Sequence, residues 1–456
     1  MSNKIYFSLF LLLLYSLSSN AQSKKWTLRE CVNYAIENNI SVKQTELDIK
    51  TSTIDKRGAV GNFLPSLNAN ASHSWNIGLN QDITTGLLQN QTNQFTSAGA
   101  NVGIDIYKGL QNQNTLRRAN LSIVAAKYQL LKMQEDIALN VANAFLQVLF
   151  NKENLKVQTV QMSINEKQLV RSQELVNAGT IPKGDLLDVK ATLASDNQKV
   201  ITAENSLLIS KLSLAQLLQL DSFQDFDIVD DTEAKDENSI LLQTPTAIYD
   251  KAKGQRTELK IAQTNLEIAE KNVAIAKGAF QPTLRGFYNF NTRISYADIA
   301  LRDNTGNVIG TYSAPPFFTQ FSDNKGQSFG AQLSIPIFNG FSVRNNVERS
   351  KVSLEKSKIA VEQQDLDLQR NVYVAFTDAK GALNAHESSI TALKSRQEAY
   401  NYAKEKFDVG LMNSFDLNQS QTLLSNAQSD VLRTKYDYIF KIKILEFYFG
   451  IPIIKN

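Results

Sequence analysis

Side chains that could carry catalytic or metal chemistry are few in this chain of 456 residues. It contains one cysteine, Cys31, and two histidines, His73 and His386. A single cysteine excludes an internal disulfide and a cysteine-rich zinc site, and two histidines give little support to a metal-ligand cluster or to acid–base catalysis. The motifs G-x-S-x-G, G-x-G-x-x-G and H-E-x-x-H and a Walker-type phosphate loop do not occur. We therefore expect no enzyme, no metal and no cofactor, and the net charge of +3 gives no reason to expect a nucleic-acid partner.

The N-terminus has the pattern of a secretory signal. Lys4 lies near the start, an apolar run extends from Ile5 to Leu17, and the small-residue site Ser19-Asn20-Ala21 follows. A membrane-spanning anchor would need about 20 apolar residues, and this run is shorter. We therefore expect residues 1–21 to be removed as a signal peptide. The exported remainder has no segment apolar enough for a transmembrane helix.

Cys31 falls just inside a predicted helix. Thr27 and Glu30 have the spacing of a capping box, in which each side chain bonds to the other residue's backbone N–H at the start of a helix. Cys31 is therefore expected to pack as a small apolar residue and not to act as a reactive thiol.

The sequence contains two copies of one pattern, which indicates an internal repeat. Residues 99–109 match residues 330–340 at an offset of 231, and residues 61–67 match residues 278–284 at an offset of 217. The second copy therefore has fourteen more residues between these blocks, and we assign them to a loop.

An acidic connector separates the two copies. Residues 221–239 hold eight acidic residues and one lysine, a composition typical of a solvated linker. We divide the mature chain into a first repeat at 22–220, a connector at 221–245 and a second repeat at 246–456. Each repeat is expected to contain a helix, two strands, a long helix and a returning helix.

Each copy has a long stretch without proline between two glycines, from Gly109 to Gly179 and from Gly340 to Gly410. Apolar residues recur in these stretches at helical spacing. A continuous helix of this length would reach about 100 Å, and it can bury its apolar stripe only against similar helices. The pattern predicts shorter helices at 28–60, 184–220, 246–277 and 413–447.

Four segments alternate between apolar and polar residues, at 66–79, 96–106, 284–296 and 328–337. One such segment would favour a soluble hairpin. Four of them in an exported chain favour strands of a transmembrane β-barrel, with apolar residues outside and polar residues inside. His73 falls on the outward face and is expected to lie near an aromatic belt.

Four strands cannot close a barrel alone. Lipid cannot satisfy the bare edge of a sheet, and the smallest bacterial barrels have about eight strands. Several copies of the chain must therefore contribute strands. A dimer and a trimer both satisfy this arithmetic, and the pattern does not choose between them.

Several segments resemble the TolC-type outer-membrane efflux protein family, and the likeness covers essentially the whole mature chain. They are Leu28-Arg29-Glu30-Cys31-Val32-Asn33-Tyr34-Ala35, Phe63-Leu64-Pro65, Ile337-Phe338-Asn339-Gly340, and Phe407-Asp408-Val409-Gly410 followed by Asp416-Leu417. The resemblance implies an α+β membrane protein. Three chains with four strands each would form one twelve-stranded barrel in the outer membrane, continued into the periplasm by a long α-helical tunnel. The acidic connector would belong to the equatorial region.

The resemblance also implies a function. The family supplies the exit duct of tripartite systems, joined by a periplasmic adapter to an inner-membrane transporter of the RND or ABC class. We expect a homotrimer in contact with outer-membrane lipid that passes small molecules such as drugs or metabolites. A duct for type I protein secretion is the alternative. A periplasmic coiled-coil or adapter protein is less consistent with the four alternating segments.

The family's periplasmic tip is formed by the turns between the long and the returning helices, where the duct narrows and the adapter docks. These turns are residues 178–184 and 409–415. The docking residues implied by the resemblance are Gly179, Thr180, Gly410, Leu411 and Met412.

The family's aperture-lining aspartates fall on the second copy. Asp416 matches the first of them by its place six residues after the glycine of the turn, and the second position holds Gln419. In the first copy Asp185 and Asp188 occupy the corresponding places.

Two interpretations of these aspartates stay open. A ring of Asp416 carboxylates, one from each subunit, would repel itself and attract cations at a narrow opening. Alternatively, Asp416 and Asp185 are the N-caps of the helices that follow. The positions where some members place a tyrosine and an arginine of a polar latch hold Phe407 and Met412 here, which departs from the family.

Overall fold

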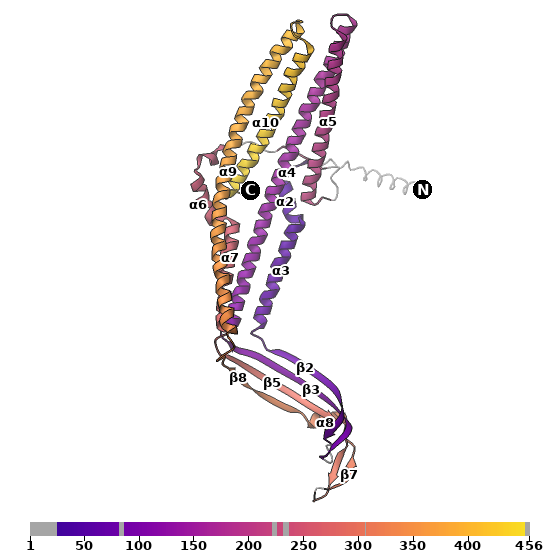
Figure 1. The fold of residues 1–456 in the computed structure, drawn as a ribbon, viewed down its shortest axis with the longest axis vertical. Helices are drawn as coiled ribbons and strands as arrows, with labels where there is room; N and C mark the ends of the chain where they lie inside the picture. The colour runs from indigo at the N-terminus through magenta and orange to yellow at the C-terminus, as the bar shows by residue number, and fades with distance from the viewer. Residues whose placement is uncertain (1–24, 82–85, 221–225, 231–236, 306, 452–456) are drawn as a thin grey trace, which may run out of the picture. The chain divides into compact units, whose positions relative to one another are not determined.

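The computed structural model describes residues 25–81, 86–220, 226–230, 237–305 and 307–451 (Figure 1). The signal peptide expected at 1–21 lies outside these residues. The helices are α2 (Leu28–Asn38), α3 (Ile40–Gly61), α4 (Gln111–Asn177), α5 (Lys183–Leu218), the short 3₁₀ helix η1 (Glu237–Leu242), α6 (Pro245–Gln255), α7 (Thr257–Gly278), α8 (Phe317–Asp323), α9 (Ser342–Asp408) and α10 (Ser414–Tyr448). The strands are β1 (Lys25–Trp26), β2 (Ser66–Gln81), β3 (Leu88–Lys108), β4 (Asp227–Ile228), β5 (Thr283–Ser295), β6 (Ile299–Arg302), β7 (Val308–Tyr312) and β8 (Gly326–Ser334).

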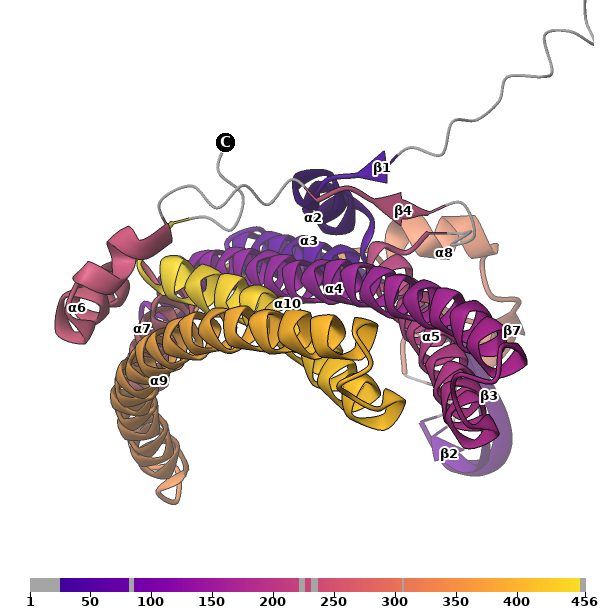
Figure 2. The same cartoon turned by 90° about the horizontal axis from the view of Figure 1, so that it is seen from above.

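The chain folds into two compact units. Of the described residues, one unit comprises those up to Asp48, those between Lys127 and Ile261 and those from Glu362 onward. The other comprises those between Ile49 and Ala126 and between Ala262 and Val361. In the first unit α5 lies beside α4 and α10 lies beside α9, so that two helical hairpins form (Figure 2). The second unit holds the main sheet.

The two long helices confirm the prediction from the glycine spacing. Helices α4 and α9 have 67 residues each. Gly109 and Gly340 precede them, and Gly179 and Gly410 follow them, all with positive φ between 57° and 77°. Glycine adopts this left-handed conformation without a steric penalty, so each pair marks where a helix begins and ends.

Two predicted single helices are wrong, because each is a pair. The segment 28–60 breaks at Asn39, and the segment 246–277 breaks at Arg256; both residues have extended backbone. At the first break, side-chain hydrogen bonds replace helical backbone bonds. The Asn39 carboxamide accepts from the Ser41 backbone N–H at 2.9 Å and donates to the Leu217 carbonyl at 3.1 Å. The breaks at positions 39 and 256 are 217 residues apart, which is also the offset between the blocks 61–67 and 278–284.

The main sheet is antiparallel, with strand order β2-β3-β5-β8. It contains the four predicted alternating segments. The register places His73 opposite Thr96, and Thr96 opposite Ile294, so these residues share one face. On that face Trp75 is 58% exposed and Phe329 is 83% exposed. Strand β8 ends at Ser334, before the predicted end at 337, in keeping with Pro336, which lacks the N–H that a ladder needs.

The extra residues of the second copy do not form a simple loop, so that expectation is wrong. Strands β6 and β7 pair as an antiparallel hairpin, and α8 packs against β5. The Phe321 ring of α8 lies 6.1 Å from the Phe290 ring of β5. Tertiary contact of this kind fixes a helix too short to be stable by itself.

The core of the helical unit is apolar and gathers around α2 and α4. Cys31 is fully buried there, and burial together with the charge of Glu30 raises the pKa of its thiol to about 12. The expectation that it packs as an apolar residue is confirmed. The Thr27–Glu30 capping box is also confirmed, with the Thr27 backbone N–H donating to Glu30 at 3.0 Å.

None of the helices in the described ranges combines the length and the hydropathy that crossing a bilayer would need.

Candidate functional site at the hairpin tips

Both helical hairpins turn with the same backbone geometry. At the end of α4 the Thr180 N–H donates to the Leu175 carbonyl at 2.9 Å, and at the end of α9 the Leu411 N–H donates to the Lys406 carbonyl at 2.8 Å. These bonds satisfy carbonyls that the helix end leaves free. The predicted turns are therefore tight and alike.

The second tip exposes large apolar side chains. Val409 is 70% exposed, Leu411 is 78% exposed and Phe415 is 64% exposed. Exposed apolar side chains that gather in one place are typical of surfaces that contact a protein, a membrane or a ligand.

The aspartates predicted for the aperture do not cap their helices, so the N-cap interpretation is wrong. Pro182 is the N-cap residue of α5, and Asn413 is that of α10. The Asn413 side chain accepts from the Asp416 backbone N–H at 2.8 Å. Asp185 and Asp416 instead lie in the first helical turn, where the helix dipole favours a negative charge.

A cavity of about 580 Å³ lies between the two tips. It brings together Thr180 and Asp185 of the first hairpin with Gly410, Leu411 and Met412 of the second. The other predicted site residues, Gly179, Asp188, Asp416 and Gln419, do not line it. Asp188, Asp416 and Gln419 are exposed at the surface instead.

An ion pair joins the two hairpins at this cavity. The Arg171 guanidinium on α4 lies 2.6 Å from the Asp408 carboxylate on α9. It also lies 5.9 Å from the centre of the Phe407 ring. Sequence reasoning missed this pair, because Arg171 belongs to no motif and only the fold brings it to Asp408.

The interface between α4 and α10 becomes polar toward the tips. Nearer the core, Phe145 of α4 and Ile439 of α10 are buried in one apolar cluster. Further along, Asn154 and Gln158 of α4 both bond to Ser429 of α10, at 3.0 and 3.3 Å.

The tip half of both helices also has buried polar side chains. They are Gln161, Asn165 and Ser172 on α4 and Ser414, Gln421 and Ser425 on α10. Among the residues described, the buried Asn165 Oδ1, Gln168 Nε2, Ser172 Oγ and Gln421 Nε2 atoms have no hydrogen-bond partner. An interface with unsatisfied polar groups holds less tightly than an apolar one.

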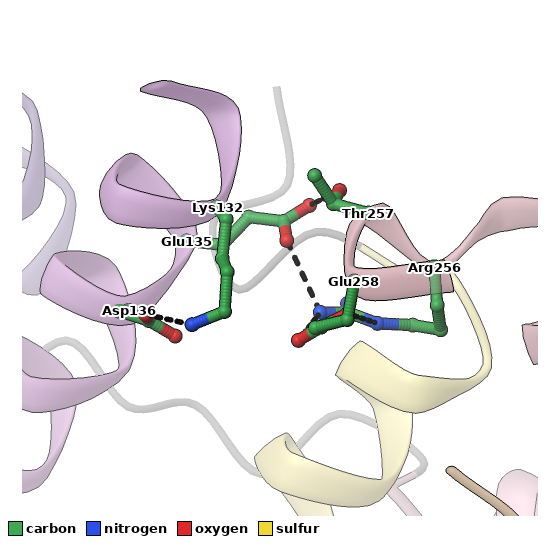
Figure 3. Close-up of polar contacts among 6 residues, drawn as sticks. All are labelled: Lys132, Glu135, Asp136, Arg256, Thr257 and Glu258. Carbon is green, nitrogen blue, oxygen red and sulfur yellow. Dashed lines mark hydrogen bonds and ion pairs between the residues drawn. The ribbon is translucent and has the colours of Figure 1, made fainter. Parts of the chain in front are cut away.

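A separate charged cluster lies where α6 meets α7 (Figure 3). The Arg256 guanidinium is 4% exposed, contacts Glu135 at 3.1 Å and Glu258 at 2.9 Å, and lies 3.8 Å from the centre of the Phe447 ring. Burial raises the pKa of Glu135. Burial also acts to raise the pKa of Glu258, but the hydrogen bonds and the charge of Arg256, with a backbone hydrogen bond and the charge of Lys132, together outweigh burial and lower that pKa. Because every charge has a partner, the cluster fixes the α6–α7 junction.

The exposed apolar face of the sheet and the paired hairpins define a class, the outer-membrane channels with a helical tunnel in the periplasm. The profile of the outer membrane efflux protein family matches residues 31–219 and 248–443. The chain belongs to this family. It is an outer-membrane efflux channel with a helical periplasmic tunnel, which confirms the family and the location expected from the sequence.

Relatives and solved structures agree with this assignment. The outer membrane protein TolC of Vibrio cholerae is 23% identical over 385 residues, which cover 83% of this chain and 80% of the relative. TolC of Escherichia coli is 21% identical over 370 residues, covering 80% and 72%. The structure of CusC is similar with a TM-score of 0.76 at 15% identity, covering 94% of this chain and 95% of CusC. That of VceC from Vibrio cholerae has a TM-score of 0.75 at 15% identity, covering 93% and 96%.

Proposed function

We propose that three copies of this chain form the exit duct of a tripartite efflux system. In this assembly the sheets form one transmembrane barrel, and the helices form a tunnel that a periplasmic adapter connects to an inner-membrane RND or ABC transporter. This proposal rests on the open four-stranded sheet, which has an exposed apolar face and the edge strands β2 and β8. An open edge is not stable in lipid, so the sheet needs further copies to close.

The helices adjoining the two edge strands support closure by the same chain. Helix α3 precedes β2, and its Ile40, Leu47 and Ile54 side chains are 55–63% exposed. Helix α9 follows β8, and its Val352, Ile359 and Leu366 side chains are 55–63% exposed. Both stripes repeat every seven residues, the period of a coiled-coil seam. Helix α3 of one copy would pack against α9 of the next, as β2 would pair with β8.

The hairpin tips would form the gated periplasmic aperture. The three Asp416 carboxylates would give it cation selectivity, with Gln419, Asp185 and Asp188 nearby. The Arg171–Asp408 pair would hold the hairpins of one copy together in the closed state. The adapter would dock on Gly179 and Thr180 of the first turn and on Gly410, Leu411 and Met412 of the second, where the exposed apolar side chains gather.

The cargo we propose is a small molecule such as a drug or metabolite. Protein secretion stays the second candidate, because the alkaline protease secretion protein AprF of Pseudomonas aeruginosa is 24% identical over 127 residues, which cover 27% of this chain. Susceptibility of a deletion strain to antibiotics and dyes, measured beside its secreted proteins, separates the two. Loss of a secreted protein with unchanged susceptibility would favour secretion.

The assembly is tested on outer membranes of the native host. Unheated samples should migrate in gels as a trimer and heated ones as a monomer, and the purified oligomer should conduct ions in planar bilayers. A soluble periplasmic monomer would contradict the duct.

A further inference from the structure

The outer end of β5 extends beyond its partner strand. Pairing between β5 and β8 stops at Asn291 and Gly326, whereas β5 continues to Ser295. This end of the strand is the one away from α7, which precedes β5. In a channel whose helices lie in the periplasm, it faces the cell exterior.

Side chains from α8 and its C-cap close this part of the β5 edge. The Gln320 carboxamide accepts from the Ser295 N–H at 2.9 Å and donates to the Ser295 carbonyl at 2.9 Å. Asn324 donates to the Arg293 carbonyl at 2.7 Å. Gln320 is buried, so its amide satisfies the two backbone groups that another strand would otherwise pair.

Helix α8 lies on the apolar face of the sheet. The Thr292 hydroxyl donates to the Phe321 carbonyl at 3.0 Å, and the Phe290 and Phe321 rings are neighbours. Thr292 and Phe290 alternate with the polar-face residues of β5 and share a face with Ile294, which the register aligns with His73.

Aromatic side chains cluster at this level of the sheet. The His73 ring lies 4.2 Å from the Trp75 ring and 5.6 Å from the Tyr296 ring. On α8, Phe317 is 40% exposed and Phe318 is 83% exposed, with ring centroids 5.3 Å apart. Aromatic rings gather where the apolar band of a membrane barrel meets the headgroups.

We propose that α8 is an interfacial element that inserts Phe317 and Phe318 into the outer leaflet of the membrane. The occupant is lipid because the exposed rings continue the apolar face of the sheet in a protein of the outer membrane. Gln320 and Asn324 favour this position, since they bond to the Ser295 N–H and carbonyl and to the Arg293 carbonyl, which would otherwise face lipid unpaired. This inference rests on the barrel proposed above.

Spin labels test the two proposals separately. The full mature protein is reconstituted in dioleoylphosphatidylcholine vesicles with one engineered cysteine in each variant, Phe318→Cys, Phe329→Cys or Ser328→Cys. The native Cys31 does not compete for the label, since it is fully buried. Phe329 is the reference for the apolar face, and Ser328 is the adjacent reference for the opposite face. Collisions with oxygen report lipid, and collisions with a water-soluble nickel chelate report water.

The label at 318 should collide with oxygen several-fold more, relative to nickel, than the label at 328. A ratio equal to that at 328 would place α8 in water and overturn the inference while the 329 label still reports lipid. Protection from both reagents would place α8 against another subunit and overturn it as well. If the 329 label itself reports water, the barrel proposal fails.

Discussion

Arg171 and Asp408 form the direct ionic contact between the two hairpin tips. Both side chains are about half exposed, so the pair contributes about 1 kcal/mol or less to folding. A contact this weak suits a closure that must open during transport.

We predict that Asp408→Asn raises the open probability of the reconstituted channel several-fold, because the pair holds the hairpins together. Single-channel recording measures this. Asp430→Asn is the matched control, since the exposed Asp430–Arg433 pair at 3.1 Å lies within α10 alone. The exchange Arg171→Asp with Asp408→Arg should restore closure. An unchanged open probability in Asp408→Asn would show that the pair takes no part in gating.

Asp416 lies in the first turn of α10 and is exposed. We predict that Asp416→Asn lowers the cation-to-anion permeability ratio, since it removes one negative charge per subunit from the proposed ring. Reversal potentials across a salt gradient measure the ratio. Unchanged cation selectivity in Asp416→Asn would contradict the proposed ring of carboxylates. Asp430→Asn, distant from the turn on the same helix, should leave the ratio unaltered.

Asp227 ties β4 to two long helices. Its carboxylate lies 3.0 Å from both Lys152 and Lys211. Burial by itself would raise its pKa, but hydrogen bonds and charge from the two lysines outweigh burial and lower the pKa below the ordinary value of 3.8. The stabilisation is therefore complete above the unfolded-state pKa and is lost as the pH falls through the folded-state pKa.

We predict that Asp227→Asn lowers the unfolding free energy by about 2 kcal/mol at neutral pH, the range for hydrogen bonds to charged groups. The difference from wild type should shrink below about pH 4. Denaturant unfolding followed by circular dichroism measures both. A difference that is the same at neutral and acid pH would contradict the assigned linkage.

At the scale of elements, Gln320 decides where the β5 edge ends. We predict that Gln320→Ala destabilises this end by about 2 kcal/mol, because two backbone groups of Ser295 lose their partner. Hydrogen exchange at residues 292–295 should accelerate more than tenfold. Thr319→Ala, an exposed neighbour on α8, is the control. Unchanged protection would mean that the cap contributes nothing to the edge.

Contacts between elements also explain the helix pairs α2–α3 and α6–α7. Apolar periodicity continues across Asn39 and Arg256, so the pattern predicts one helix in each case. The breaks depend on partners far along the chain, the Leu217 carbonyl for Asn39 and Glu135 for Arg256. Local periodicity contains no information about these partners.

At the scale of the molecule, the exposed heptad stripes of α3 and α9 are explained if copies of the chain assemble and these stripes pack together. We predict that Ile359→Asp, which places a charge in the proposed seam, converts the trimer largely to monomer. Unheated gels and light scattering measure this. Ser357→Asp, nearly opposite Ile359 on the helix, is the control and should stay trimeric. A fully trimeric Ile359→Asp would contradict pairing of α3 with α9.

The sequence by itself determined the long helices, the four strands and the family. Gly109, Gly179, Gly340 and Gly410 mark helix ends through local backbone preference, and period-two alternation over ten residues identifies strands without their partners. Both signals depend on neighbours along the chain. The division into two repeats and the aperture role of Asp416 stay predictions.

Only the tertiary structure decided which distant side chains meet. It paired Arg171 with Asp408, broke two helices at Asn39 and Arg256, and folded α8 over the β5 edge. It also replaced the expected aspartate N-caps with Asn413 and Pro182. The first three outcomes depend on contacts whose free energy exists only once segments far apart in the chain are packed together, so no local pattern predicts them. The Asn413 cap is instead a local bond from the Asp416 N–H, three residues further along, and the preference of asparagine for N-caps could have indicated it.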